Sequence, residues 1–184
     1  FWLGIAAFVG VLALDLLVGV GFAVLLSATV MLLRVARPHA AVLGHVPGMA
    51  GMHDVGEYPT AIEVDGLLVF RYDSPLFFAN GDVFAQAAQR AVTGAGVDKV
   101  HHLVIDMEAV TDVDVTGAEA FTALEGWLDQ QHVTLSFSRM RPEARARLIR
   151  LGLLDSQRVF ATNRAAIAAL SGNGDKAVAH PGKE

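Results

Sequence analysis

The stretch Leu103–Phe121, LVIDMEAVTDVDVTGAEAF, leads from an apolar strand through an acidic loop into a helix. Residues 103–105 have the composition of a buried strand, and Thr116-Gly117 begins a helical pattern. The loop between them carries four carboxylates, those of Asp106, Glu108, Asp112 and Asp114. A junction of this kind directs backbone N–H groups toward solvent, where a ligand, a phosphoryl group or a partner protein can meet them. It is therefore the first candidate for a functional site.

Strands and helices alternate on both sides of this stretch. In chain order, the pattern predicts a helix at 83–92, a strand at 100–106, a helix at 116–131, a strand at 133–138, a helix at 142–151, a strand at 158–160 and a helix at 164–170. Such alternation favours right-handed crossovers and a mainly parallel sheet. The turn Asp65-Gly66 predicts a hairpin between strands at 62–64 and 67–70. The predicted fold class is α/β, a mixed, mainly parallel sheet packed with about four helices.

Residues 1–33 differ from the rest of the chain in charge, because Asp15 is their only charged residue. The uncharged run Leu16–Leu33 would extend about 27 Å as a helix, just enough to cross a bilayer core. Arg34 and Arg37 follow it, and basic residues directly after a span mark the cytoplasmic side. We therefore expect terminal transmembrane helices at 1–33, the first one truncated. The protein is then a multi-pass protein of the plasma (inner) membrane, with its remaining residues in the cytoplasm. The alternative is a buried helical hairpin of a soluble protein.

Composition divides the remaining residues into three parts. Residues 34–59 are predicted to be a linker, because Pro38–Pro59 contains three Pro and four Gly without a sustained period. Its histidines, including His39, lack acidic companions in the sequence and are expected at the surface. Residues 60–170 form the predicted domain, and the polar, Gly-rich residues 171–184 are predicted to be disordered.

Charge and cysteine content exclude several classes of function. The net charge of −5 argues against a nucleic acid as partner, because a phosphate backbone requires a basic surface. The absence of Cys excludes disulfides and thiolate metal sites.

Two catalytic or metal-binding interpretations of the acidic loop fail on spacing. Asp112, Asp114 and Thr116 match the D-x-D-x-T motif of phosphatases that use a nucleophilic aspartate. That nucleophile should directly follow a strand, but the predicted strand ends at Asp106, and no Lys follows the loop until Lys176. A calcium loop would need Glu where Ala123 stands. The sequence therefore predicts no enzyme, no metal site and no cofactor.

A purely structural interpretation of the loop is that it caps a helix. Thr116 and Glu119 have the spacing of a capping box, in which the Thr hydroxyl and the Glu carboxylate each accept a backbone N–H. Asp114 would complement the positive helix end.

Five arginines follow the next predicted strand, namely Arg139, Arg141, Arg145, Arg147 and Arg150. Arg139, Arg141 and Arg145 are candidates to contact an anion, a lipid headgroup or the phosphates of a nucleotide. The alternative is a solvated face that pairs with acidic residues.

Three runs in this order, RVARPHAAVLGHVPG, LLVFRYDSPLFFANGDVF and LVIDMEAVTDVDVTGAEAF, resemble the C-terminal end of SulP anion transporters. In that family the last membrane helices lead into a cytoplasmic STAS domain. The resemblance implies a transporter of inorganic anions such as sulfate, or of dicarboxylates, that is usually a homodimer. It also implies that residues 60–170 are a STAS domain serving trafficking, assembly and regulation. The implied partners are membrane lipid, a second transporter copy, a cytoplasmic regulatory protein and a nucleotide.

The chain is also similar to soluble anti-sigma-factor antagonists, in which a Ser directly after the loop Asp becomes phosphorylated. The matching residue here is Val115, which has no hydroxyl. We therefore expect a constitutive docking surface, formed by Asp106, Asp112, Asp114, Val115, Thr116 and Gly117. The alternative function is a membrane-anchored STAS signalling module that binds a partner protein or a guanine nucleotide.

Overall fold

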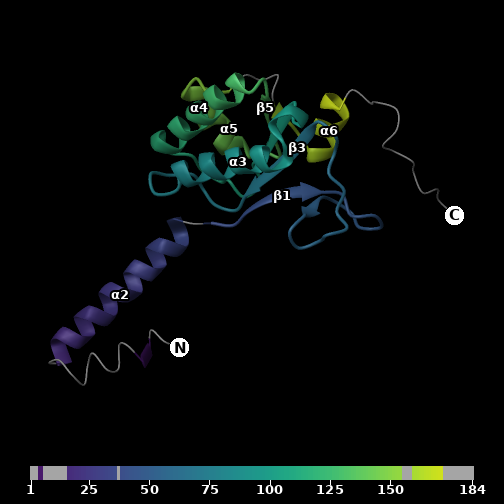
Figure 1. Ribbon diagram of the computed structural model, residues 1–184. Coiled ribbons are helices and arrows are strands. Elements are labelled where there is room, and N and C mark those ends of the chain that lie inside the picture. The colour runs from purple at the N-terminus through teal and green to yellow at the C-terminus, as the bar shows by residue number, and fades with distance from the viewer. Residues whose placement is uncertain (1–3, 6–15, 37, 155–158, 172–184) are drawn as a thin grey trace. The chain divides into compact units, whose positions relative to one another are not determined.

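The computed structural model describes residues 4–5, 16–36, 38–154 and 159–171 (Figure 1). The chain divides into two compact units, residues 1–37 and residues 38–184. Most of the predicted first membrane span at 1–14, and the predicted disordered tail beyond Ser171, lie outside the described residues.

The first unit contains the helix α2 (Leu16–Ala36). Its large apolar side chains are mostly exposed, Leu17 to 82% and Met31 to 69%. Among the helices that the structure describes, none combines the length and apolarity needed to cross a membrane. The transmembrane helices expected at 1–33 stay a prediction. The helix also does not end where the charges begin, because it continues past Arg34 to Ala36.

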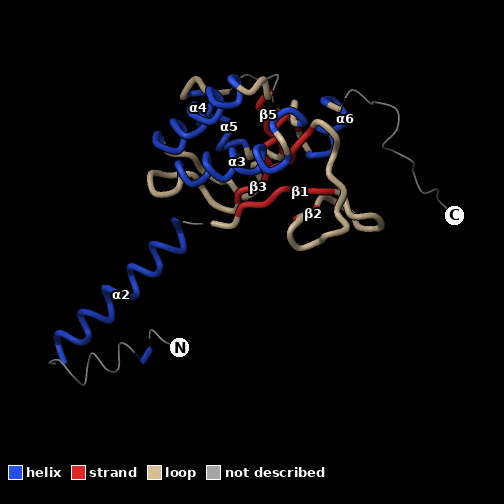
Figure 2. The backbone as a smooth tube through the Cα atoms, viewed as in Figure 1, coloured by secondary structure: helices blue, strands red, loops and turns tan. Residues whose placement is uncertain are grey.

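The second unit is built on one mixed sheet (Figure 2). Its strands are β1 (Ala40–Gly44), β2 (His53–Asp54), β3 (Leu67–Tyr72), β4 (His102–Asp106), β5 (Thr134–Ser138) and β6 (Val159–Phe160). Their order across the sheet is β2-β1-β3-β4-β5-β6. The strands β3 to β6 are parallel, whereas β1 runs antiparallel to both of its neighbours. The prediction of a mixed, mainly parallel sheet is confirmed.

Two predictions at the start of this unit were wrong. Residues 34–59 are not a linker, because β1 and β2 lie within them and β1 pairs with β3 along Ala40–Leu43. The predicted hairpin partner of β3 at 62–64 forms only isolated bridges. The strand β1 takes that place because pairing with β3 buries Leu43 to 2% exposure.

Helices cover both faces of the sheet (Figure 1). They are α3 (Gly81–Ala95), α4 (Val115–Gln130), α5 (Pro142–Arg150) and α6 (Asn163–Leu170), with a short 3-10 turn, η1, at Val97–Lys99. Alternate residues of β3 serve two cores, because side chains point to opposite faces along a strand. Phe70 packs with the core that includes Phe84 of α3 and Phe121 of α4, and Val69 with the core that includes Ala166 of α6.

Candidate functional site

The acidic loop begins α4 through Asp114 and not through Thr116. The Oδ1 atom of Asp114 accepts a hydrogen bond from the backbone N–H of Gly117 at 2.7 Å, so Asp114 is the N-cap. The capping box predicted at Thr116 and Glu119 was therefore wrong. The helix begins two residues earlier than a cap at Thr116 requires, because Asp114 has the extended backbone of an N-cap residue. Thr116 lies exposed in the first turn.

A second loop, residues 74–80, is joined to the acidic loop. The N–H of Leu76 donates to the carbonyl of Asp112 at 3.0 Å, and the N–H of Asp114 donates to the carbonyl of Leu76 at 3.0 Å. The Oδ2 atom of Asp114 also accepts the N–H of Phe78 at 3.1 Å. One carboxylate thus caps a helix and fixes a neighbouring loop.

Gly117 allows these two loops to approach closely. A Cβ atom at this position would lie 2.8 Å from the carbonyl oxygen of Leu76, closer than real Cβ contacts. The first turn of α4 can therefore rest against Leu76 only because residue 117 has no side chain.

Loop 74–80 is itself held by the buried side chain of Asn80. Its Oδ1 accepts the N–H of Phe77 at 3.0 Å, and its Nδ2 donates to the carbonyl of Pro75 at 2.9 Å. The hydroxyl of the buried Tyr72 donates to the carbonyl of Asn80 at 3.4 Å, and burial raises the pKa of Tyr72 to about 12. The loop is therefore fixed by hydrogen bonds to two buried side chains, those of Asn80 and Tyr72.

Two apolar side chains near Asp114 are exposed to solvent. Phe78 is 76% exposed and Val115 is 59% exposed. Although Phe78 is aromatic, its side chain is not part of the hydrophobic core, and its backbone N–H is bonded to Asp114 at the surface. We call Phe78, Asp114, Val115 and Thr116 the loop surface.

Asp106 does not belong to the loop surface. It is fully buried, and its carboxylate accepts hydrogen bonds from Asn163 Nδ2 at 2.8 Å and from the N–H of Glu108 at 3.0 Å. Arg139 approaches it to 3.4 Å. The predicted acidic site therefore divides into a buried part at Asp106 and an exposed part around Asp114.

The network around Asp106 continues through residues that the sequence did not single out. Ser138 is the register partner of Asp106 on β5, and its hydroxyl donates to the side chain of Asn163 at the start of α6. Both residues are buried. The sequence did contain a signal for this network. Asp106 and Ser138 are polar residues at the carboxyl ends of two strands, and these ends become neighbours when the strands pair in parallel.

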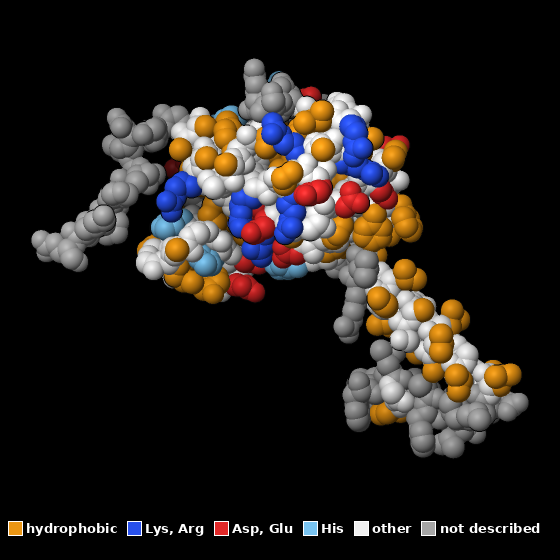
Figure 3. All heavy atoms as spheres, turned by 180° about the vertical axis from the view of Figure 1, so that it is seen from behind, with side chains coloured by type: hydrophobic (Ala, Val, Ile, Leu, Met, Phe, Trp, Pro, Cys, Tyr) orange, Lys and Arg blue, Asp and Glu red, His pale blue; other side chains and the backbone are white. Residues whose placement is uncertain are grey.

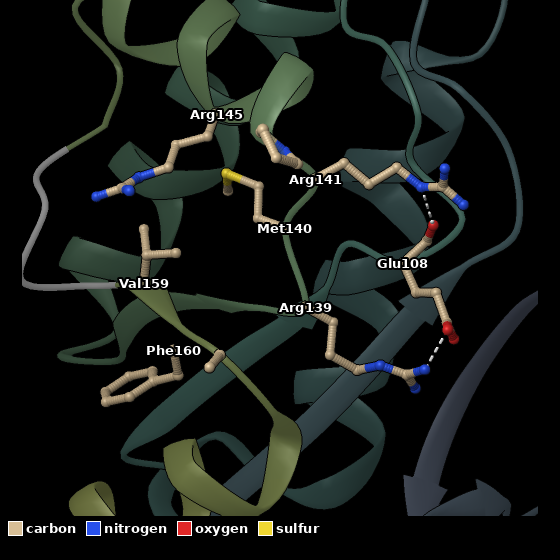
Figure 4. A pocket seen from close by; sticks show the side chains of 9 residues that line it. Glu108, Arg139, Met140, Arg141, Arg145, Val159 and Phe160 are labelled. Carbon is tan, nitrogen blue, oxygen red and sulfur yellow. Dashed lines mark hydrogen bonds and ion pairs between the residues drawn. The ribbon is translucent and has the colours of Figure 1, made fainter.

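The three arginines predicted to contact an anion line one groove of about 630 Å³ (Figure 4). Its lining residues are Glu108, Arg139, Met140, Arg141, Pro142, Arg145, Val159, Phe160 and Ala161. We call it the arginine groove. It lies beyond the carboxyl ends of β5 and β6, where ligands bind in open α/β sheets.

Two of these arginines already have partners. Arg139 forms ion pairs with Asp106 and Glu108, and Arg141 donates to the carbonyl of Glu108 at 3.3 Å. The structure records no ion pair for Arg145 among the described residues.

The remaining arginines of the cluster have local roles. Arg147 donates to the carbonyl of Val113 at 3.0 Å and so ties α5 to the acidic loop. Arg150 donates to the carbonyl of Ala146 within α5. On the face drawn in Figure 3, basic side chains are interleaved with acidic ones and form no continuous patch.

A separate hydrogen bond joins a histidine and a carboxylate at the start of the second unit. The ring of His39 is 2.8 Å from the Oδ2 atom of Asp54, so the sequence was misleading in showing no acidic companion for His39. Burial would raise the pKa of Asp54, but hydrogen bonds from Gly56 and His39 hold that pKa below its ordinary value. Within the described ranges, no group of three His, Asp or Glu side chains could hold a metal ion.

Comparison of the sequence with known protein families identifies the family of this domain. The STAS domain family matches residues 58–166, which is more than half of the chain. The chain belongs to the STAS domain family. The STAS domain predicted from the sequence motifs is therefore confirmed, and the loop surface and the arginine groove are both parts of it.

Relatives of the chain include sulfate transporters. A probable sulfate transporter of Mycobacterium tuberculosis is 41% identical over 155 residues, covering 83% of this chain and 27% of the relative. High affinity sulfate transporter 2 of Stylosanthes hamata is 32% identical over 143 residues, covering 74% of this chain and 22% of the relative. The chain thus spans about a quarter of the length of these relatives. The resemblance to SulP transporters is confirmed.

A solved structure supports the same fold. The murine anion transporter Slc26a9 in its inward-facing state superposes with a TM-score of 0.77 at 24% identity. The superposition covers 93% of this chain and 28% of the transporter chain.

Proposed function

We propose that this chain is the C-terminal part of a SulP-type secondary anion transporter of the sulfate class. Its STAS domain then acts as a cytoplasmic module for regulation and assembly, and it catalyses no reaction. The observation that carries the proposal is the 41% identity over 155 residues to a probable sulfate transporter. That match is longer than the 58–166 range of the STAS domain and so extends beyond it.

The rest of the proposal concerns location and partners. The relatives named as sulfate transporters support a location in a membrane. With it we propose a multi-pass protein of the plasma (inner) membrane that contacts lipid and is assembled as a homodimer. The transport site itself requires more of the protein than this chain, because such sites lie among helices at the middle of the bilayer.

The loop surface is the proposed contact for a cytoplasmic regulatory protein. Phe78 and Val115 are apolar, exposed and adjacent to the carboxylate of Asp114. Exposed apolar side chains that lie together mark protein contacts, and aromatic residues such as Phe are enriched at the core of such contacts. Because residue 115 is Val, this surface is present without phosphorylation, as the docking interpretation of the sequence requires.

Anion uptake tests the transport proposal. Cells producing the full-length transporter should take up labelled sulfate, and competition with bicarbonate and dicarboxylates defines the anion. Uptake equal to that of cells without the transporter would contradict the proposal.

Regulation is tested separately with the paired variant Phe78→Ser, Val115→Ser. It should change uptake or dimer yield at an unchanged amount of folded protein. Ile149→Ser, another exposed apolar residue, is the matched control. Equal effects of both variants would reject the loop surface as a specific contact.

A further inference from the structure

The arginine groove combines a charged wall and an apolar wall. Arg139, Arg141 and Arg145 supply three guanidinium groups, against one lining carboxylate, that of Glu108. The apolar lining comes from Met140, Val159 and Phe160. A groove of about 630 Å³ is larger than an inorganic anion and of the size that binds small organic ligands.

Arg139 is held in an unusual conformation at the edge of this groove. Its φ of 54° is in the left-handed region, which is unfavourable for a residue with a side chain. Its N–H donates to the carbonyl of Phe160 at 3.1 Å, and its guanidinium lies 3.4 Å from the buried Asp106. Residues held in such conformations concentrate at ligand sites, and here the result is a pre-positioned guanidinium.

The carboxylate of Glu108 lies where an anion would bind. Figure 4 shows Arg139 at the carboxylate of Glu108 and Arg141 at its backbone carbonyl, while Arg145 extends from α5 on the other side of Met140. Glu108 is 52% exposed, so its side chain can leave Arg139 for solvent at small cost. Asp106 is buried and keeps its contact with Arg139.

We propose that the arginine groove binds a phosphate monoester whose organic part is apolar. The phosphate replaces the Glu108 carboxylate at Arg139, the lining guanidinium of Arg145 adds positive charge, and the organic part lies against Met140 and Val159. A phosphate dianion suits this position because guanidinium groups bind phosphate through paired, charge-assisted hydrogen bonds. Glu108 is then a built-in competitor that weakens binding and sets the ligand concentration at which the groove fills.

The ester can come from a soluble molecule or from a lipid headgroup, and the test has one arm for each. Calorimetric titration of the purified 184-residue chain with phenyl phosphate measures the soluble arm. Co-sedimentation with vesicles containing phosphatidic acid, compared with phosphatidylcholine alone, measures the lipid arm. Saturable binding below about 1 mM is expected in at least one arm.

Four variants test the geometry. Glu108→Gln should tighten binding about threefold to fivefold, because a competing carboxylate is removed. Arg145→Gln should weaken it by about threefold or more. Glu143→Gln and Arg150→Gln change exposed residues of α5 outside the groove lining, so they should leave the binding affinity unchanged.

Binding that responds in this way supports the proposal, and the arm in which it occurs identifies the source of the ester. Absence of saturable binding in both arms overturns it. So does binding that Glu108→Gln and Arg145→Gln leave at the wild-type value, since both side chains are exposed and their substitution preserves the fold. The titration needs no transport, so its failure leaves the transport proposal standing.

Discussion

The side chains of Asp106 and Asn163 are joined by a hydrogen bond of 2.8 Å that links the carboxyl end of β4 to the start of α6. Both side chains are buried, and 57 positions of sequence separate them. This bond also helps to hold α6 on its face of the sheet. Because Asp106 also faces Arg139, it connects the interior of the STAS domain to the arginine groove.

Asp106→Ala should lower the free energy of unfolding by about 3–5 kcal/mol, because it leaves the buried Asn163 amide and the Arg139 guanidinium without their carboxylate. Urea unfolding of the chain followed by circular dichroism measures the loss. Asp129→Ala, an exposed carboxylate on α4, should change it by less than about 0.5 kcal/mol. Similar values for both variants would contradict the role assigned to Asp106.

Gly117→Ala should destabilise the domain by about 1–3 kcal/mol, because the new Cβ would lie 2.8 Å from the carbonyl of Leu76. Gly126→Ala lies on the same helix, where a Cβ would meet nothing within 4 Å. It should stabilise the domain by about 0.5–1 kcal/mol. The two variants should therefore shift the melting temperature in opposite directions. A shared direction would show that α4 does not contact Leu76 as described.

Asp114→Ala should lower the free energy of unfolding by about 1–2 kcal/mol, because the cap of α4 and the hydrogen bond to the N–H of Phe78 are both lost. Asp114→Ser should recover part of this loss, since a Ser hydroxyl can cap but cannot also reach Phe78. Thr116→Ala should have an effect below about 0.5 kcal/mol. If chemical denaturation showed a larger loss of stability for Thr116→Ala than for Asp114→Ala, it would favour the capping box predicted at Thr116 and Glu119 over the cap at Asp114.

Asp54 should make the stability of the domain depend on pH at the acid end. Its folded pKa lies below the ordinary value of 3.8, so its contribution is present above about pH 4 and is lost as pH falls through the folded pKa. Asp54→Asn should reduce stability by about 1–2 kcal/mol at pH 7. The difference between wild type and variant should shrink below about pH 4 in a series of urea titrations. Asp98→Asn, at an exposed carboxylate, is the control and should change stability at pH 7 by less than about 0.5 kcal/mol. A difference that stays constant down to pH 2 would refute the ionic role of Asp54.

The sequence by itself determined the alternation of strands and helices, the mainly parallel sheet and the STAS domain. Helix α4 was predicted at 116–131 and lies at Val115–Gln130, because local propensity and apolar periodicity act over a few residues. Only the tertiary structure decided that β1 pairs with β3, that Asp114 caps α4, and that Asp106 is buried away from Asp114. These outcomes involve partners far away in the chain, Tyr72 for β1, Phe78 for the carboxylate of Asp114 and Asn163 for Asp106, whose proximity exists only once the sheet has formed. The arginine groove has the same origin, because the carboxyl ends of two parallel strands bring Arg139 and Phe160 together.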